Sequence, residues 1–185
     1  LPPAEHAQHF QPPPRFELHP RASRPDHNMP MHLPFDAAGR LWVTTSIEYP
    51  FPAPTNRSGR DRLMIFEDFG PDGRARKITQ FADGLNIPTG VYPFRLADGH
   101  WKAIVWSIPN IWLLEDSDGD GKADKRTPIY GPFDFYSDSH GMQSFFRRGF
   151  DGWLYVTHGF NIACHVHVTD GREGNSNSGN TFAID

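Results

Sequence analysis

The chain has 185 residues, enough for one domain with a sizeable core, and its formal net charge of −4 gives no attraction to nucleic acid or to an anionic membrane surface. No apolar run approaches the roughly 18 residues of a transmembrane helix, and these residues contain no signal peptide. Cys164 is the only cysteine, which excludes an internal disulfide and a Cys-x-x-Cys-His haem attachment. Eighteen prolines and seventeen glycines favour turns over long helices.

The first 30 residues are rich in proline and histidine and show no hydrophobic periodicity. We expect residues 1–30 to form an extended arm. Within it, residues 15–18 (Arg-Phe-Glu-Leu) predict a short strand that would form an outer edge or a closing strand of a sheet.

Three units of short strands and turns follow the arm. The first is predicted to have strands at 29–35, 41–47, 62–67 and 76–81. The second is predicted to have strands at 91–96, 101–107, 111–115 and 125–130. The third is predicted to have strands at 142–147 and 153–157, a long loop, and a strand that begins near Thr181. The units span about residues 28–85, 86–137 and 138–185.

Two sequence segments recur through these units. Residues 63–77 align with residues 111–125, and an Asp-Gly turn followed by an apolar strand occurs at 36–43, 98–105 and 151–156. A repeat of about 50 residues made of strands and turns predicts the blades of a β-propeller. We therefore expect an all-β fold in which residues 31–185 form two and a half to three four-stranded blades. Since propellers need about four to eight blades, the remaining blades would come from the same or another chain. The alternative is an open three-sheet structure that folds alone.

The loop after the predicted strand at 111–115 has the spacing of a calcium loop. Aspartates occupy its positions 1, 3, 5 and 9, with glycine at position 6: Asp116, Asp118, Asp120, Asp124 and Gly121. The carbonyl of Lys122 is a further predicted ligand. Position 12 is Thr127 rather than the glutamate of an EF-hand, so we expect a calcium-clipped hairpin. The alternative is an Asp/Gly-rich turn without metal.

The aligned turn at 68–76 has Gly70 and Arg76 at positions 3 and 9, so it is predicted to form the same hairpin without an ion. A third candidate cluster contains soft ligands near the end of the chain: His158, Cys164, His165 and His167. In a strand, His165 and His167 share a face and could hold a transition metal. The alternative is a surface loop with incidental histidines.

Alternation of strand direction sorts the loops onto two faces of the predicted blades. His140 precedes the first strand of the third unit, whereas Glu48 and His158 follow the second strands of their units. These three residues are therefore expected on one face, and the predicted calcium loop on the other.

The order and spacing of several motifs resemble a known family. The motifs occupy residues 35–43, 49–52, 59–62, 81–90, 116–124 and 177–181. Together they resemble the PVC-type membrane-bound dehydrogenase propellers of bacteria, which are relatives of the soluble glucose/sorbosone dehydrogenases that use pyrroloquinoline quinone (PQQ). The resemblance implies a six-bladed propeller in the periplasm or outside the cell, with a sugar or alcohol as substrate. It also implies a haem domain or cytochrome as electron acceptor.

The segment from His140 to Val156 is similar to the segment that carries the catalytic histidine in the PQQ enzymes. The similarity implies that His140 is the general base that takes the alcohol proton as hydride leaves for the quinone, with Glu48 and His158 beside the cofactor. The sequence departs from that pattern at Gln143 and Ser144, which replace Gly-Arg. Two functions therefore stay open: a sugar or alcohol dehydrogenase, and a propeller without PQQ that binds a glycan or a protein partner.

Overall fold

The structure is a computed structural model that describes residue 5 and residues 9–136, 139–160, 164–168, 170–176 and 179–184. Most of the first eight residues of the predicted arm lie outside this part, as do residues 177–178 of the last family motif. Within the described residues no helix has the length and apolarity needed to cross a bilayer.

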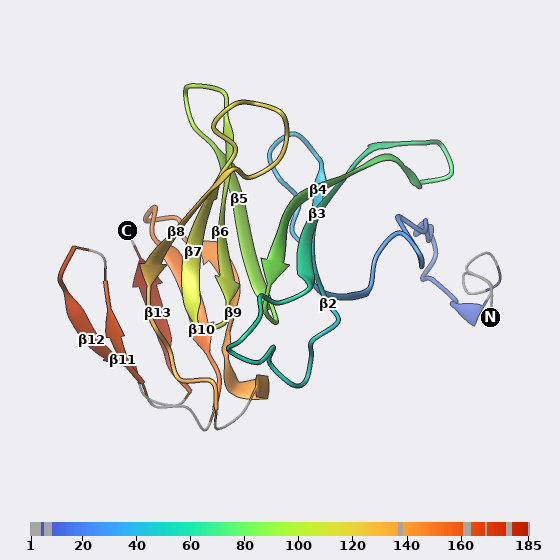
Figure 1. Cartoon of the computed structure of the whole chain (residues 1–185). Helices are drawn as coiled ribbons and strands as arrows, with labels where there is room; N and C mark the ends of the chain where they lie inside the picture. Colours follow the sequence, from blue (N-terminus) through green and yellow to red (C-terminus); the bar gives the residue numbers. More distant parts are fainter. Residues whose placement is uncertain are drawn as a thin grey trace.

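The chain forms an all-β structure of antiparallel sheets (Figure 1). The first sheet contains β1 (Met29–His32), β2 (Leu41–Ser46), β3 (Asp61–Phe69) and β4 (Ala75–Leu85). The second contains β5 (Gly90–Arg95), β6 (Trp101–Ser107), β7 (Asn110–Glu115) and β8 (Lys125–Tyr130). In both sheets the strands pair in chain order.

The third sheet follows a short 3₁₀ turn, η2 (Ser139–Gly141), and has three strands in the order β13-β10-β9. These strands are β9 (Gln143–Arg148), β10 (Leu154–His158) and β13 (Thr181–Ile184). Between β10 and β13 the chain makes a separate hairpin of β11 (Cys164–His167) and β12 (Glu173–Ser176). In Figure 1 this hairpin lies at one side of the molecule and the first sheet at the other, with the second and third sheets between them.

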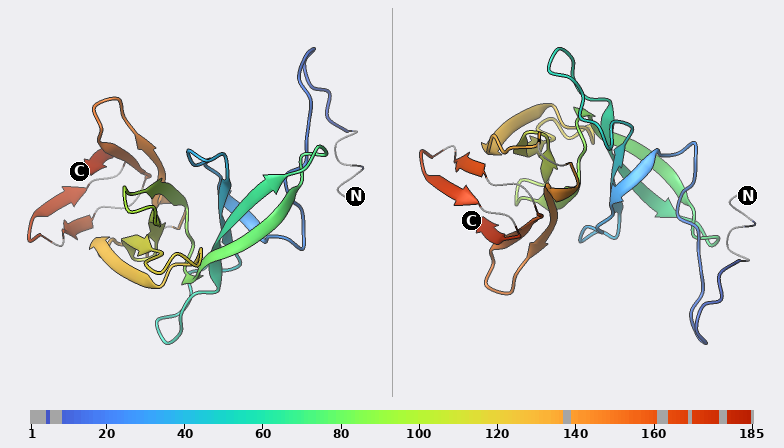
Figure 2. Two further views of the ribbon diagram at one scale, coloured as in Figure 1. Left: turned by 90° about the horizontal axis from the view of Figure 1, so that it is seen from above. Right: turned by 90° about the horizontal axis from the view of Figure 1, so that it is seen from below.

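Two apolar cores join the three sheets. One core lies between the first and second sheets and includes Trp42, Leu63, Phe81, Val91 and Val105. The other lies between the second and third sheets and includes Trp106, Ile111, Phe133, Phe146 and Val156. The second sheet therefore buries side chains on both faces, which places it between the other two (Figure 2).

The first strands of the three sheets contact one another. The N–H of Val91 in β5 donates to Nδ1 of His32 in β1 at 3.0 Å. Before β5, the hydroxyl of Thr89 donates to the carbonyl of Gln143 in β9 at 2.5 Å. Each sheet thus presents its first strand to the first strand of the next sheet, and the later strands lie further out.

Every predicted strand of the three units overlaps an observed strand, but two predictions outside those strands were wrong. Residues 15–18 form no strand, because they lie between Pro14 and Pro20 and begin in a turn where Arg15 has a φ of 75°. The arm instead reaches the β3–β4 hairpin, where the N–H of Ala75 donates to the backbone carbonyl of Arg21 at 3.0 Å. The long loop predicted in the third unit contains the β11–β12 hairpin.

Candidate functional site

The loop between β2 and β3 lies at one end of the sheets and is organised by Asp61. This first residue of β3 is fully buried. Its carboxylate accepts hydrogen bonds from the hydroxyl of Ser46 at 2.8 Å and from the N–H groups of Ile47, Glu48 and Ile87 at 2.5, 3.1 and 2.7 Å. These bonds to a charged acceptor offset the cost of burying it. They also tie the loop to the segment that enters β5.

Glu48 lies in the same loop, between two arginines. Arg57 donates to its two carboxylate oxygens at 2.7 and 2.8 Å, and the Nε of Arg60 donates at 3.0 Å. The hydrogen bond from Arg57, with that from Arg60, lowers the pKa of Glu48 to about 2 against the opposing effect of burial. The family resemblance implied that Glu48 lies beside the cofactor, whereas here its carboxylate oxygens bind two arginines of its own loop.

This arrangement predicts an acid-sensitive contribution of Glu48 to stability. Its pKa falls from 4.5 to about 2 on folding, so the contribution is complete above about pH 4.5 and is lost as the pH falls toward 2. We expect Glu48→Gln to have a lower melting temperature than the wild type near neutral pH. In acid, the difference between the two melting temperatures should become smaller. Melting curves from about pH 7 to about pH 3 measure this difference.

Glu17→Gln is the matched control, since that carboxylate is 83% exposed. It should melt like the wild type across the same pH range. A melting difference between wild type and Glu48→Gln that does not change with pH would contradict the role assigned to the ion pair.

His140 lies in η2 and belongs to the same end of the molecule. It is exposed, and its ring meets Tyr49 edge-on with centroids 5.4 Å apart. The next residue, Gly141, is buried, and a Cβ there would lie 1.9 Å from the carbonyl oxygen of Phe160, so only glycine fits. The structure therefore brings η2 against both the loop after β2 and the segment after β10.

His158 is the last residue of β10 and is 3% exposed, so its prediction as a loop residue was wrong. The alternation of buried Leu154 and Val156 continues through it. Burial lowers the pKa of its imidazole. Opposite it in β9 is Gln143, which is fully buried. His158 and Gln143 are thus buried cross-strand neighbours of the third sheet, whereas His140 is exposed.

The loop at 116–124 lies at the opposite end of the sheets from η2 (Figure 1). Asp116 is buried, and its carboxylate accepts the N–H groups of Gly119 at 2.8 Å and Gly121 at 3.1 Å. Both glycines have positive φ, 80° and 87°, which residues with a Cβ rarely adopt. The two glycines allow the loop to fold back over Asp116.

Three of the four carboxylates predicted as calcium ligands converge in this loop. They belong to Asp116, Asp118 and Asp120, with oxygens that all lie within 4.8 Å of one another. The fourth, Asp124, accepts hydrogen bonds from the hydroxyl of Ser117 at 2.8 and 2.9 Å. The N–H of Lys122 donates to Asp120 at 2.8 Å. Convergent oxygens are the ligands that calcium prefers, so the residues fit this ion with Asp124 turned aside.

The aligned turn after β3 is tighter than the acidic loop. Strand β3 extends to Phe69, beyond its predicted end, and β4 already begins at Ala75, before its predicted start. The N–H of Gly70 donates to the carbonyl of Arg74 at 2.9 Å. The repeat therefore keeps a hairpin at both positions but gives it two different turns.

The predicted soft-ligand cluster divides between two elements. His158 belongs to β10, whereas His165 and His167 lie on β11. The side chain of Cys164 lies outside the described part of the structure. The sequence analysis did not name Glu173 on β12 as a candidate ligand. One of its carboxylate oxygens lies within 4.8 Å of a ring nitrogen of each β11 histidine.

A scan against protein-family models matches residues 2–185 to the family described as a domain of unknown function, DUF7133. The chain belongs to this family. A search of the curated proteins finds no match to it. Because the description of the DUF7133 family gives no activity, the function has to be argued from the arrangement of the side chains.

Two residues of this DUF7133 domain shape the His140 end and were not predicted to do so: Asp61 and Arg57. In the sequence, Asp61 was noted only as part of the family motif at residues 59–62. Its partners are mostly backbone N–H groups, which carry no signal in the sequence. A charged residue at the start of a buried strand is the one signal that could have drawn attention to it.

Proposed function

We propose that the three sheets are blades of a six-bladed β-propeller. The adjacent first strands β1, β5 and β9 and the cores between successive sheets support this arrangement, because blades pack face to face around a central axis. Three blades do not close a ring, so further blades complete it. On the side of β10 away from the core, Tyr155 is 38% exposed and is available to such a blade.

The proposed activity is that of a periplasmic sugar or alcohol dehydrogenase of the glucose/sorbosone dehydrogenase type. The observation that carries this proposal is the exposed imidazole of His140, held against Tyr49 where the chain enters the first strand of the third sheet. A histidine in such a position can take the proton of a substrate hydroxyl. PQQ, when bound, supplies the hydride acceptor.

The described residues supply a base but do not make a cradle for PQQ. The cofactor's carboxylates need cationic partners. In the loop beside His140, Arg57 and Arg60 already bind Glu48. We derive no step through the quinone and assign its binding to the further blades.

The same contacts favour a second candidate, a propeller that binds a glycan or a protein partner without PQQ. Glu48 is held by arginines, and Gln143, which departs from the pattern of the PQQ enzymes, is buried away from any ligand. A partner would then bind the exposed surface around His140 without being oxidised.

Titration of the intact protein with PQQ, in the presence of calcium and a redox dye, separates the two candidates. A panel of sugars and alcohols serves as substrate. Reduction of the dye that requires both PQQ and a substrate supports the dehydrogenase. Saturable binding of a glycan or protein without dye reduction supports the binding propeller.

We further propose that the loop at 116–124 binds calcium, through Asp116, Asp118, Asp120 and the carbonyl of Lys122. Asp124, which here accepts hydrogen bonds from Ser117, would join them by releasing that hydroxyl. The prediction is that Asp120→Ala removes the calcium-dependent part of thermal stability. An ion at a hundred times its dissociation constant contributes about 2.7 kcal/mol, so the melting temperature of the wild type should rise measurably with calcium. Melts in calcium and in EDTA test this.

Asp72→Ala is the matched control, because Asp72 occupies the aligned turn that is predicted to hold no ion. Its melting temperature should keep the full response to calcium. Equal melting of the wild-type protein in calcium and in EDTA would refute the proposed site.

A further inference from the structure

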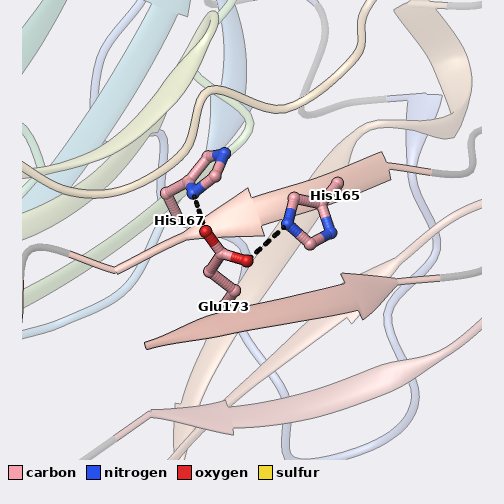
Figure 3. Close-up of side chains that lie close together, drawn as sticks. All are labelled: His165, His167 and Glu173. Carbon is pink, nitrogen blue, oxygen red and sulfur yellow. Dashed lines mark hydrogen bonds and ion pairs between the residues drawn. The ribbon is translucent and has the colours of Figure 1, made fainter. Parts of the chain in front are cut away.

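The β11–β12 hairpin gathers two imidazoles and a carboxylate on one of its faces (Figure 3). Nε2 of His165 lies 3.2 Å from one carboxylate oxygen of Glu173, and Nδ1 of His167 lies 3.1 Å from the other. The two imidazole rings are nearly perpendicular, with centroids 5.0 Å apart. The carboxylate thus lies between the two rings.

The pairing of the two strands produces this cluster. His165 and His167 are two residues apart on β11, so their side chains leave the same face of the hairpin. Glu173 is the direct cross-strand partner of His167, and Asn175 is that of His165. Cross-strand partners lie close enough for their side chains to meet, so the register itself brings the three groups together.

A cation is the natural occupant of the space between these groups. Nδ1 of His165 lies 2.8 Å from Oδ1 of Asn175. When that nitrogen donates its proton to the amide oxygen, Nε2 directs a lone pair at a carboxylate oxygen, and two acceptors that face each other need a proton or a metal ion between them.

We propose that His165, His167 and Glu173 form a binding site for one divalent transition-metal ion. Bonds from zinc to nitrogen and oxygen are about 2.0–2.2 Å long, which places tetrahedral ligands about 3.3–3.6 Å apart. The observed separations of 3.1 and 3.2 Å are close to this value, so the ion fits with small movements of the side chains. Asn175 then orients the ring of His165, as groups behind metal ligands commonly do.

Three protein ligands leave at least one coordination position open, and all three residues are exposed. The site therefore has the ligand number of a reactive or exchangeable centre rather than of a closed structural one. Glu173 and Asn175 also border a cavity of about 270 Å³ whose wall includes Phe133, Trp153 and Phe182.

The hairpin is tied to the second sheet rather than to the acidic loop. The N–H of Gly131, just after β8, donates to the carbonyl of His167 at 3.0 Å, and Tyr130 bridges to Val168. Imidazole ligands prefer transition metals, whereas the loop at 116–124 offers only oxygen, the ligand of calcium. The two sites should therefore bind different metals independently.

The test is titration of the intact, EDTA-stripped protein with zinc alone, measured by isothermal titration calorimetry. We expect one ion whose affinity falls at least about a hundredfold in Glu173→Gln and in His165→Gln, since even the loss of a group behind a ligand costs about 10–100-fold. Cobalt in place of zinc should give a visible absorption spectrum that both variants lose.

His19→Gln is the matched control. His19 lies 3.1 Å from Glu17 on the surface, in a pair without a second histidine, so its loss should leave zinc affinity unchanged. Asp120→Ala should also leave zinc affinity unchanged. Zinc binding that survives Glu173→Gln, or no zinc binding by the wild type, would overturn the proposal and assign a proton to the space between His165 and Glu173.

Discussion

Replacing Asp61 by alanine is expected to destabilise the chain by about 4 kcal/mol. The carboxylate is fully buried and accepts four hydrogen bonds, three of them from backbone N–H groups. Alanine leaves these donors without an acceptor in a site closed to water, and each buried donor left so costs about 1–3 kcal/mol. Denaturant titration of wild type and variant measures the loss, with the midpoint shifting at constant slope.

A loss of this size approaches the whole stability of many domains, so a milder variant is compared with the alanine variant to keep folding measurable. Asp61→Asn keeps the size and one acceptor oxygen, but turns an NH₂ group toward N–H donors, and should cost about 2 kcal/mol. Asp98→Asn is the control, since Asp98 is exposed and its carboxylate accepts the N–H of His100 at 2.9 Å. Equal stability of the Asp61 and Asp98 variants would refute the role assigned to Asp61.

The strands of the three sheets could be predicted from sequence because their signals are local. The repeated Asp-Gly turns end strands, and the apolar runs between them fill the two cores, as Trp42 and Val105 do. The β11–β12 hairpin lacks this signal: its strands are four residues long and carry His, Asn and Glu in place of an apolar stripe. It is held instead by backbone pairing, which a residue pattern does not display.

The candidate sites divide in the same way. The spacing of the aspartates in the acidic loop predicts the convergence of three carboxylates, because all the ligands come from one short segment. Sequence could not show that Arg57 and Arg60 bind Glu48, or that Glu173 lies beside His165, since those contacts depend on how two segments meet. It also could not separate His140, which is exposed, from His158, which is buried.

His140→Gln is expected to abolish dye-linked turnover by the intact protein if the imidazole takes the substrate proton. General-base catalysis contributes about 10²–10⁴-fold, and glutamine cannot accept the proton. Because His140 is exposed and packs on one side against Tyr49, stability should change little. Steady-state rates with PQQ and dye, together with melting curves, measure the two effects separately.

The opposite pattern identifies a structural role for the same residue. If the ring only fills the junction between η2 and the loop after β2, His140→Gln should lower the melting temperature by several degrees and leave turnover or ligand affinity intact. A loss of about 1 kcal/mol in the free energy of unfolding lowers the melting temperature of a chain of this size by about 2–4 °C. Calcium binding should be unaffected in either case, because the acidic loop lies at the other end of the sheets (Figure 1). His19→Gln, on the distant arm, serves as the control for both measurements. Turnover retained by His140→Gln would remove the proposed base, and the surface beside Tyr49 would then be left as a binding face.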